Sequence, residues 1–321
     1  MKSISVIVLL YNPNLRKSLI TLKSILMQRN ADYEIVVSDD GSEMDYFSEI
    51  EAYFKNNNFR NYSFVKNKEN IGTVKNCFGA IKKAKGKYVF LTSPGDMLYD
   101  SDVLHNFYEF AERRSAKIVF GNAVMYNVTD KINIENSVRN PICPEYYAEN
   151  NSVKKMYMSA LFGNQIIGAA YFRERETALE YFSEIQSFVK YVEDSTSTLL
   201  ALADGVRVYH YDRNIVWYEA GTGVSTSENT EWQKTIQNEI ITAMNKLIEK
   251  NPNDAVIDKA IRIINTKGVL KKILILLNRP VVLWFFLIFK LKSKFGRNTI
   301  EYDRSKLEKL LSTEEYENAS N

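Results

Sequence analysis

Three groups of polar residues in the first third of the chain each follow a short apolar run directly. Ligands of a parallel sheet bind outside the carboxyl ends of its strands, so side chains in these positions are candidates for chemistry. Neither a GxGxxG fingerprint nor a P-loop follows the first run, so a nucleotide bound here would have no glycine-rich phosphate cradle. Acidic side chains at this edge instead favour a divalent cation that holds phosphate oxygens. The three groups are YN at residues 11–12, DDGS at residues 39–42 and TSPGD at residues 92–96.

The elements that would position these groups alternate between apolar runs and helix-spaced segments from Ser3 to about Tyr126. The run Ile4–Leu10 is continuous and rich in β-branched residues, as expected for a strand covered on both faces. Strands separated by long helical segments imply right-handed crossovers and a mostly parallel sheet. The pattern therefore predicts a doubly wound α/β fold. The predicted strands are 4–10, 33–38, 62–65, 88–91 and 118–120, and the predicted helices are 15–27, 46–54, 74–84 and 103–111.

The second half of the chain has a less regular pattern, without an internal repeat or a low-complexity linker. We predict one catalytic domain over residues 1–228, with halves 1–126 and 127–228, followed by a helical C-terminal extension over 229–321. The elements predicted here are helices at 146–162, within 178–203, at 232–250 and at 256–264, strands at 166–172 and 206–218, and a polar loop at 221–229.

The composition is that of an ordinary globular protein of 321 residues, with 45% hydrophobic and 25% charged residues. Two cysteines cannot form a disulfide framework for such a chain, which favours a reducing cytoplasm. A formal net charge of +3 argues against a strongly basic nucleic-acid binder, so no nucleic acid is expected as a partner. The apolar N-terminal stretch is too short for a signal peptide, and no apolar run is long enough for a membrane-spanning helix.

Residues 267–297 form a basic, aromatic segment with eight lysines or arginines and no acidic residue. Without these eight, the chain has 34 basic and 39 acidic residues, a formal charge of −5. The apolar run at 281–289 would extend about 13 Å as a helix, against roughly 30 Å for a hydrocarbon core. We therefore predict that the segment lies on a membrane surface, with its lysines on anionic headgroups. A buried helix pair, or a homodimer contact through the C-terminal helices, is the alternative.

Five motifs in a fixed order resemble those of the family 2 glycosyltransferases, whose nucleotide-sugar-binding fold is called GT-A. The resemblance extends from residue 1 to about residue 225, and several motifs in the right order are more specific than any single one. It implies an α/β GT-A fold, a nucleotide-sugar donor and an acceptor glycan. The motifs are SVIVLLYN at 5–12, EIVVSDDGS at 34–42, NKENIGTVKN at 67–76, AKGKYVFLTSPGD at 84–96 and VEDS at 192–195.

The resemblance implies a nucleotide site along the first three strand ends. Tyr11 would offer an aromatic face to a uracil-like base, and Asp39 would accept a hydrogen bond from its imino group. From the residues alone, DDGS could equally cap a helix or make a turn, and Lys75 could be a solvated helix residue. The residues that the resemblance places at the nucleotide are Tyr11, Asn12, Asp39, Asp40, Asn70, Gly72, Lys75, Asn76, Ser93 and Gly95.

The resemblance also implies a metal site after the fourth strand, where the family usually has a DxD-type cluster. Here Thr92 stands where an acidic residue is common, and Asp96 is the carboxylate that remains, because Asp100 and Asp102 look like the start of the next helix. A single carboxylate can hold Mg²⁺ or Mn²⁺ when phosphate oxygens and water supply the other ligands. We therefore expect a metal that the free enzyme holds weakly.

The catalytic residues that the resemblance implies are Asp194 as general base and Glu193 as its supporting partner, in an inverting transfer. An acidic pair that merely opens a helix is the alternative. The resemblance places Gly168 in an acceptor-side wall. It also suggests a lid that closes over the substrates, for which a plain surface loop is the alternative. The lid residues are Gly221, Thr222, Gly223 and Ser225.

These expectations describe an inverting glycosyltransferase that moves a sugar from a UDP-sugar to a hydroxyl of a glycan. A surface anchor suits a lipid-linked acceptor, as in bacterial capsule or O-antigen assembly on the inner face of the cell membrane. This last step is an analogy. Two alternatives stay open, a nucleotidyltransferase and a weakened family member that binds sugar nucleotide, or scaffolds an assembly, without turnover.

Overall fold

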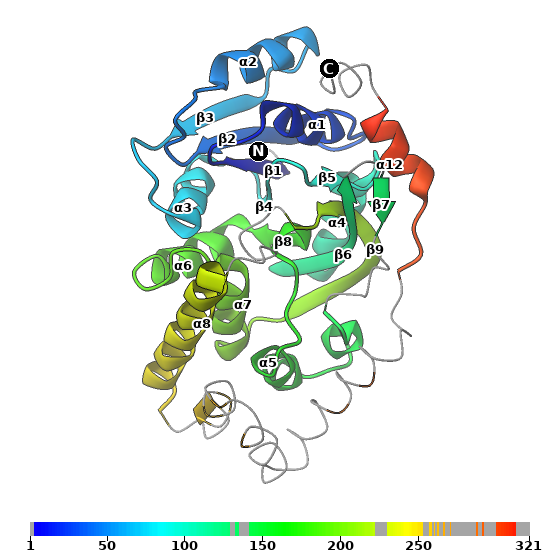
Figure 1. Cartoon of the computed structure of the whole chain (residues 1–321). Coiled ribbons are helices and arrows are strands. Elements are labelled where there is room, and N and C mark those ends of the chain that lie inside the picture. The colour runs from blue at the N-terminus through cyan, green and yellow to red at the C-terminus, as the bar shows by residue number, and fades with distance from the viewer. Residues whose placement is uncertain are drawn as a thin grey trace.

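The computed structural model describes residues 3–128, 132–134, 141–221, 230–252 and 300–312, together with residues 257, 258, 260, 262, 266, 270, 287 and 291. Within these residues, nine strands form one sheet (Figure 1). The strands are β1 (Ile4–Leu10), β2 (Tyr33–Asp39), β3 (Tyr62–Lys66), β4 (Tyr88–Thr92), β5 (Met97–Leu98), β6 (Ile118–Val128), β7 (Ile132–Ile134), β8 (Tyr171–Glu174) and β9 (Val208–Glu219).

The sheet has the strand order β3-β2-β1-β4-β8-β6-β9-β5, with β7 paired to β6. Strands β3, β2, β1 and β4 are parallel, β8 is antiparallel to both of its neighbours, and β6 and β9 are parallel to each other. Because β1, β2 and β4 run side by side in one direction, the three polar groups that follow them come to one edge of the sheet.

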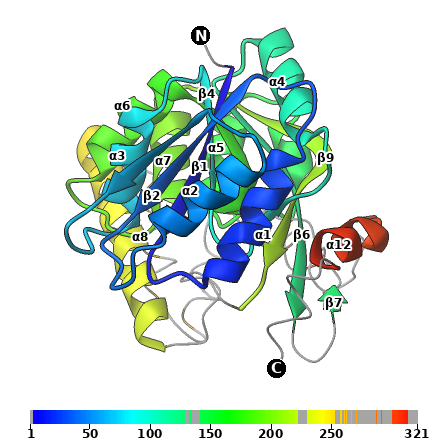
Figure 2. The ribbon, with the colours of Figure 1, turned by 90° about the horizontal axis from the view of Figure 1, so that it is seen from above.

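Helices cover both faces of the sheet (Figure 2). In β1, Ile4, Val6 and Val8 face one apolar core together with α1, α2, α4 and α12, whereas Ile7 faces a second core with α3 and α5 to α8. This explains why β1 is apolar except at Ser5, whose buried hydroxyl donates to Glu34 at 2.7 Å. The helices are α1 (Leu15–Leu26), α2 (Phe47–Asn56), α3 (Thr73–Lys83), α4 (Val103–Arg114), α5 (Val153–Leu161), α6 (Arg175–Ile185), α7 (Glu193–Ala203), α8 (Thr230–Lys250) and α12 (Arg304–Leu311), with 3₁₀ turns η1 (Pro144–Tyr147) and η2 (Gly168–Ala170).

The predicted doubly wound α/β fold and its elements up to residue 120 are confirmed, with ends that shift by a few residues and with β6 running on to Val128. The predicted strand at 166–172 is wrong over residues 166–170, which contain the turn η2, and the predicted helix at 146–162 is a 3₁₀ turn followed by α5. The periodicity of a short apolar run does not by itself distinguish a strand from a buried turn. The side chain of Asn164 fixes this region by bonding the backbone N–H and C=O of Cys143 at 3.0 Å each.

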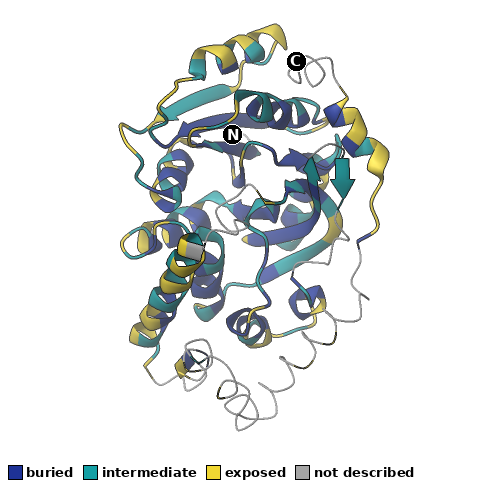
Figure 3. Ribbon diagram, in the orientation of Figure 1, coloured by how far each residue is buried: buried dark blue, intermediate teal, exposed yellow. Residues whose placement is uncertain are grey.

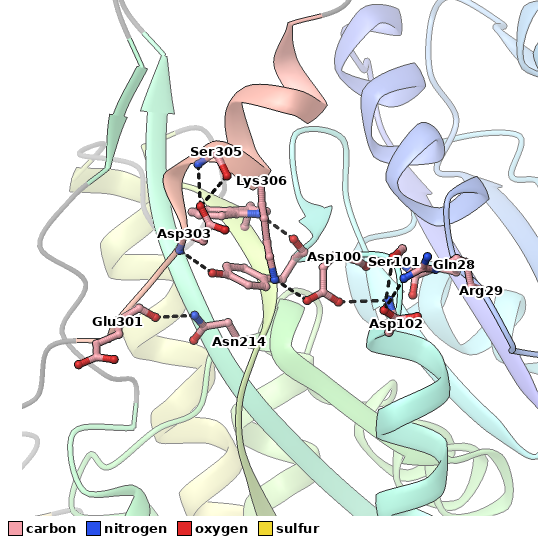
Figure 4. Close-up of polar contacts among 12 residues, drawn as sticks. Gln28, Arg29, Asp100, Ser101, Asp102, Asn214, Glu301, Asp303, Ser305 and Lys306 are labelled. Atoms are coloured by element: carbon pink, nitrogen blue, oxygen red, sulfur yellow. Dashed lines mark hydrogen bonds and ion pairs between the residues drawn. The ribbon is translucent and has the colours of Figure 1, made fainter.

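Helix α12 packs against the N-terminal part of the chain, on the side of the turn that follows β5 (Figure 4). Lys306 forms an ion pair with Asp100 at 2.8 Å, and the backbone N–H of Asp303 donates to the hydroxyl of Tyr99 at 2.8 Å. Leu307 and its neighbours Leu310 and Leu311 are buried, so Figure 3 shows a dark inner face and an exposed outer face on this helix. Helix α12 is therefore part of the first apolar core, together with α1, α2 and α4.

None of the helices in the described part of the chain is long and apolar enough to cross a membrane. Most of the basic segment 267–297, most of the predicted helix 256–264 and residues 222–229 of the predicted loop lie outside the described residues.

Candidate active site

A cleft of about 740 Å³ opens at the carboxyl ends of β1 and β4 and is lined by all the regions that the motifs singled out. The lining includes residues that follow β1, β2 and β4, together with the start of α3. It also includes residues 165–169, the first turn of α7, the end of β9 and two isoleucines of α8. The cleft therefore brings segments from both halves of the chain to one site.

Asp40 shapes the wall of the cleft next to β2. Its buried carboxylate accepts hydrogen bonds from the backbone N–H groups of Ile71 and Gly72 at 3.0 Å each, and from the side chain of Asn67 at 3.1 Å. Gly72 has a φ of 91° there, and a Cβ at this position would lie 2.3 Å from the side chain of Lys190. Asp40 thus holds the loop that forms the first part of the motif NKENIGTVKN.

Asp39 and Asn12 take part in a turn behind this wall. The Asp39 carboxylate accepts from the backbone N–H of Ser42 at 3.0 Å and from its hydroxyl, and the Asn12 side chain accepts from the backbone N–H of Glu43 at 2.9 Å. Neither Asp39 nor Asn12 is among the residues that line the cleft. The turn that the residues alone allowed for DDGS is therefore present, and a direct role of Asp39 at a base stays a prediction.

The remaining nucleotide candidates divide between the cleft and the outer surface. Tyr11 lines the cleft with 53% of its surface exposed, so its ring is accessible to a ligand. Asn76 also lines it, buried, with its side-chain oxygen accepting from the hydroxyl of Ser38 at 2.6 Å. Lys75 is exposed, and neither it nor Asn70 is among the lining residues.

The TSPGD segment meets two charged residues that the sequence did not single out, Lys17 and Glu219. Asp96 accepts a hydrogen bond from the backbone N–H of Glu219 at 3.1 Å, and both carboxylate oxygens of Glu219 accept from Lys17 at 2.7 and 2.8 Å. Gly95, with a φ of 99°, gives space to this carboxylate, because a Cβ there would lie 2.2 Å from it. Ser93 is exposed and lines the cleft. Glu219 directly follows the predicted strand 206–218 and ends β9, which was the available signal.

The oxygen ligands near Asp96 suit a hard divalent cation. Burial raises the pKa of Asp96 to about 8, and the negative charge of Glu219 adds to this rise, although backbone hydrogen bonds oppose it. A cation would relieve this electrostatic cost, and carboxylate oxygens are what Mg²⁺ and Mn²⁺ prefer. Within the described residues, no cluster of three or more His, Cys, Asp or Glu side chains could hold a metal. Phosphate oxygens or water would therefore have to complete the coordination.

Glu193 and Asp194 are the first two residues of α7, and both line the cleft. Burial, and then the charge of Asp194, raise the pKa of Glu193 well above its usual range, while the positive charge of Arg173 opposes the rise. A proton therefore resides more readily on Glu193 than on an ordinary glutamate. Asp194 accepts from the backbone N–H of Ser195 through Oδ1 at 2.6 Å.

The predicted acceptor-side glycine, Gly168, lies directly against the catalytic candidate. A Cβ at Gly168 would lie 2.8 Å from Oδ2 of Asp194, so the absence of a side chain allows the carboxylate to reach the cleft wall. Gly221 is exposed, with a φ of 86°, whereas Thr222, Gly223 and Ser225 lie outside the described residues. The lid therefore stays a prediction. Two lining residues that the motifs missed, Ile236 and Ile240, come from α8.

Comparison with known proteins connects this geometry to a family. Two solved structures share the fold at low identity. One is TarS 1-349 of S. aureus in complex with UDP-GlcNAc, with 16% identity and a TM-score of 0.55 over 81% of this chain and 70% of that chain. The other is the mannosyltransferase PcManGT from Pyrobaculum calidifontis in complex with GDP-Man and Mn²⁺, with 16% identity and a TM-score of 0.52 over 92% of this chain and 88% of that chain.

The sequence of the chain identifies the family more specifically than the likeness in fold does. No curated protein sequence matches the chain. The model of glycosyl transferase family 2, however, matches residues 5–171, which is more than half of the chain and includes four of the five motifs. Together with the likeness in fold, this match confirms the predicted GT-A α/β architecture. The chain belongs to glycosyl transferase family 2.

Proposed function

We propose that the protein is an inverting glycosyltransferase that moves a sugar from a UDP-sugar to a hydroxyl group of a glycan acceptor. The observation that carries this proposal is the position of Asp194, which lines the same cleft as Tyr11 and Asp96. A donor bound along the β1–β4 edge would therefore present its sugar to a carboxylate on the α7 side.

In this proposal Asp194 removes the proton of the acceptor hydroxyl as its oxygen attacks the anomeric carbon from the face opposite the leaving diphosphate. General-base help of this kind contributes about 10²- to 10⁴-fold to a rate. Glu193 supports the base, because a proton held on Glu193 reduces the negative charge beside Asp194. Gly168 leaves the space through which Asp194 reaches the cleft.

On the donor side, Asp96 is the residue that would hold Mg²⁺ or Mn²⁺, with Glu219 beside it. Such a cation, when bound, supplies neutralisation of the charge that grows on the leaving diphosphate. Lys17 adds a positive side chain to the same part of the cleft. Titration calorimetry with Mn²⁺ tests the predicted weak hold: binding should be weak for the free protein and should tighten when UDP is present. Tight binding without nucleotide contradicts this.

The donor is tested first with a panel of UDP-, GDP-, CDP- and dTDP-sugars in thermal-shift measurements, followed by assays of nucleotide release with Mn²⁺ or with EDTA. We expect a UDP-sugar to raise the melting temperature most, by mass action on the folded state. Release of free UDP should require the wild-type Asp194. The two relatives are described with different donors, UDP-GlcNAc and GDP-Man, so preference for a guanine nucleotide would overturn the uridine part of the proposal.

A second candidate is a family member that binds sugar nucleotide without turnover. The observation that favours it is the TSPGD segment, in which Asp96 is the single carboxylate. Nucleotide release distinguishes the two candidates, because the second predicts a thermal shift without any free nucleotide under either metal condition.

We further propose a role at the inner face of the cell membrane, in surface polysaccharide assembly on a lipid-linked acceptor. The eight basic residues of 267–297 support this proposal. So do the three described leucines of the segment, Leu270, Leu287 and Leu291, which are exposed by 59%, 46% and 52%. Exposed apolar side chains among lysines are typical of interfacial helices.

Neutralising charges in segment 267–297 tests the proposed membrane binding better than deleting the segment through residue 321, because the deletion would also remove the buried helix α12. The variant changes Lys290, Lys292 and Lys294 to Gln, and the control changes the exposed Lys82, Lys83 and Lys85 of α3 and its end to Gln. Flotation with vesicles containing anionic lipid should show weaker binding for the first variant alone. Equal binding of both variants and the wild type contradicts the proposal, and a salt-insensitive dimer in light scattering would favour the homodimer contact.

A further inference from the structure

The loop that leads into the catalytic pair is held by a carboxylate from another helix. Glu239 of α8 accepts hydrogen bonds from three successive backbone N–H groups, those of Lys190 at 3.1 Å, Tyr191 at 2.9 Å and Val192 at 3.0 Å. The next residue is Glu193, the first residue of α7. Hydrogen bonds from N–H groups to a carboxylate are shorter and stronger than neutral ones, so this contact fixes the backbone of the loop.

Glu239 binds the residues immediately before α7, a helix that has no side-chain cap of its own at Val192. The N-cap position of α7 is Val192, whose side chain has no oxygen and makes no capping hydrogen bond. The N–H groups at a helix start need partners, and a serine, threonine or aspartate at this position usually supplies one. Here the loop amides bind a carboxylate 47 residues further along the chain. The orientation of the first turn of α7 therefore depends on where α8 lies.

The position of α8 is itself well determined. Ala243, Met244 and Leu247 are buried in the second core together with Leu199 and Leu200 of α7. At the other end of the contact, the rings of Trp232 and Tyr191 meet edge to face, with centroids 4.9 Å apart. Within α8, Trp232, Ala243 and Leu247 recur at helical spacing on the same side as Glu239. Glu239 thus extends from a packed helix and not from a loose loop.

The same loop also contacts the nucleotide side of the cleft. The carbonyl of Lys190 accepts a hydrogen bond from the backbone N–H of Val74 at 3.0 Å, and the side chain of Lys190 covers Gly72. Gly72 in turn donates to Asp40. Residues 190–192 therefore lie between the loop held by Asp40 and the carboxylates of α7, and Glu239 binds them at this junction.

We propose that Glu239 is a positioning residue for Glu193 and Asp194: it fixes the backbone of residues 190–192 so that the base faces the donor. The inference rests on the proposed role of Asp194. Glu239 does not touch the reacting atoms, so its loss lowers kcat through misplacement of the base and changes the KM for the donor little. A misplacement of about 1 Å can cost on the order of 10²-fold in rate.

Two variants and one control test the proposal in the full-length protein. Glu239→Ala removes every acceptor, whereas Glu239→Gln keeps one oxygen, because a carboxamide nitrogen cannot accept. Glu249→Gln removes the same charge from the same helix at a side chain that is 64% exposed and pairs with Lys246. Each protein is assayed for kcat and KM with the donor found in the thermal-shift panel, and for hydrogen exchange of the amides of residues 190–192.

We expect exchange at these amides to accelerate, and kcat to fall by about 10- to 100-fold, in the order wild type, Glu239→Gln, Glu239→Ala. The control should match the wild type. Exchange that stays slow in Glu239→Ala overturns the contact, and faster exchange with an unchanged kcat overturns the positioning role. If Glu239→Ala does not fold, Glu239→Gln gives the same comparison. A wild type that releases no nucleotide from any donor overturns the proposed function instead, while the exchange measurement still tests the contact.

Discussion

On the β2 side of the cleft, the carboxylates themselves bind backbone N–H groups. On the α7 side, the loop before the carboxylates is held by a residue of a different helix. Asp40 accepts from the loop at residues 71–72, and Asp39 from Ser42. Glu193 instead lies where burial raises its pKa, and Glu239 binds the preceding amides. The first arrangement shapes a wall, and the second keeps carboxylates available for protons.

This difference predicts that substitutions on the two sides have different consequences. On the β2 side, loss of a carboxylate leaves backbone donors without an acceptor, which lowers stability and distorts the nucleotide wall. On the α7 side, loss of a carboxylate removes a proton acceptor that few other groups depend on, so activity falls while the fold remains.

The largest effect is expected for Asp194→Asn. Transfer should fall by about 10²- to 10⁴-fold because the amide cannot accept the acceptor proton, while the dissociation constant for UDP stays unchanged. Nucleotide release and titration calorimetry measure the two quantities. The control is Asp204→Asn, at the C-terminal end of the same helix. Wild-type turnover in Asp194→Asn would show that the base is another group.

Asp40→Asn should act through stability. The amide cannot satisfy all the donors that point at the Asp40 carboxylate, so we expect a loss of about 1–3 kcal/mol in the free energy of unfolding and weaker nucleotide binding. Urea unfolding and calorimetry check this. Asp45→Asn, at an exposed ion pair with Lys66, is the matched control and should change stability little. If Asp40→Asn lost turnover alone, the contrast between the two sides would fail.

The raised pKa of Glu193 predicts the direction in which the free energy of unfolding changes with pH. Its folded pKa is raised above the unfolded value of 4.5, so the folded protein binds this proton more tightly than the unfolded chain. The stabilisation from this proton is complete when the pH is below the unfolded pKa. It is lost as the pH rises through the folded pKa. From about pH 5 to about pH 8, the unfolding free energy of the wild type should therefore fall relative to that of Glu193→Gln. Parallel curves in urea unfolding would exclude a raised pKa.

The smallest effect is expected for Lys75→Ala. This side chain is exposed and is not among the residues that line the cleft, so its loss should change nucleotide binding by no more than about 0.5 kcal/mol. Calorimetry with UDP measures the change, and Asn76→Ala provides the contrast, since Asn76 is buried and bonded to Ser38. A large loss of affinity in Lys75→Ala would show that the start of α3 moves toward the nucleotide on binding.

The first half of the fold could be predicted because its signals are local. The continuous run Ile4–Leu10 and the helical spacing after it need only neighbours in the chain to be recognised, and β1 and α1 lie there. The second half mixes short turns with strands. Gly168 begins the turn η2 and lies against Asp194, and nothing within the apolar run around it indicates that contact.

Motifs and periodicity are properties of consecutive residues, so the family, the doubly wound sheet and the carboxylates at the strand ends could be predicted from the chain alone. Which distant groups meet these carboxylates depends on the tertiary structure. Glu219 reaches Gly95 across 124 positions, Lys17 pairs with Glu219 across 202, and Glu239 binds the loop before Glu193 and Asp194. Such contacts depend on how helices pack on the sheet, and packing joins residues that no local pattern connects.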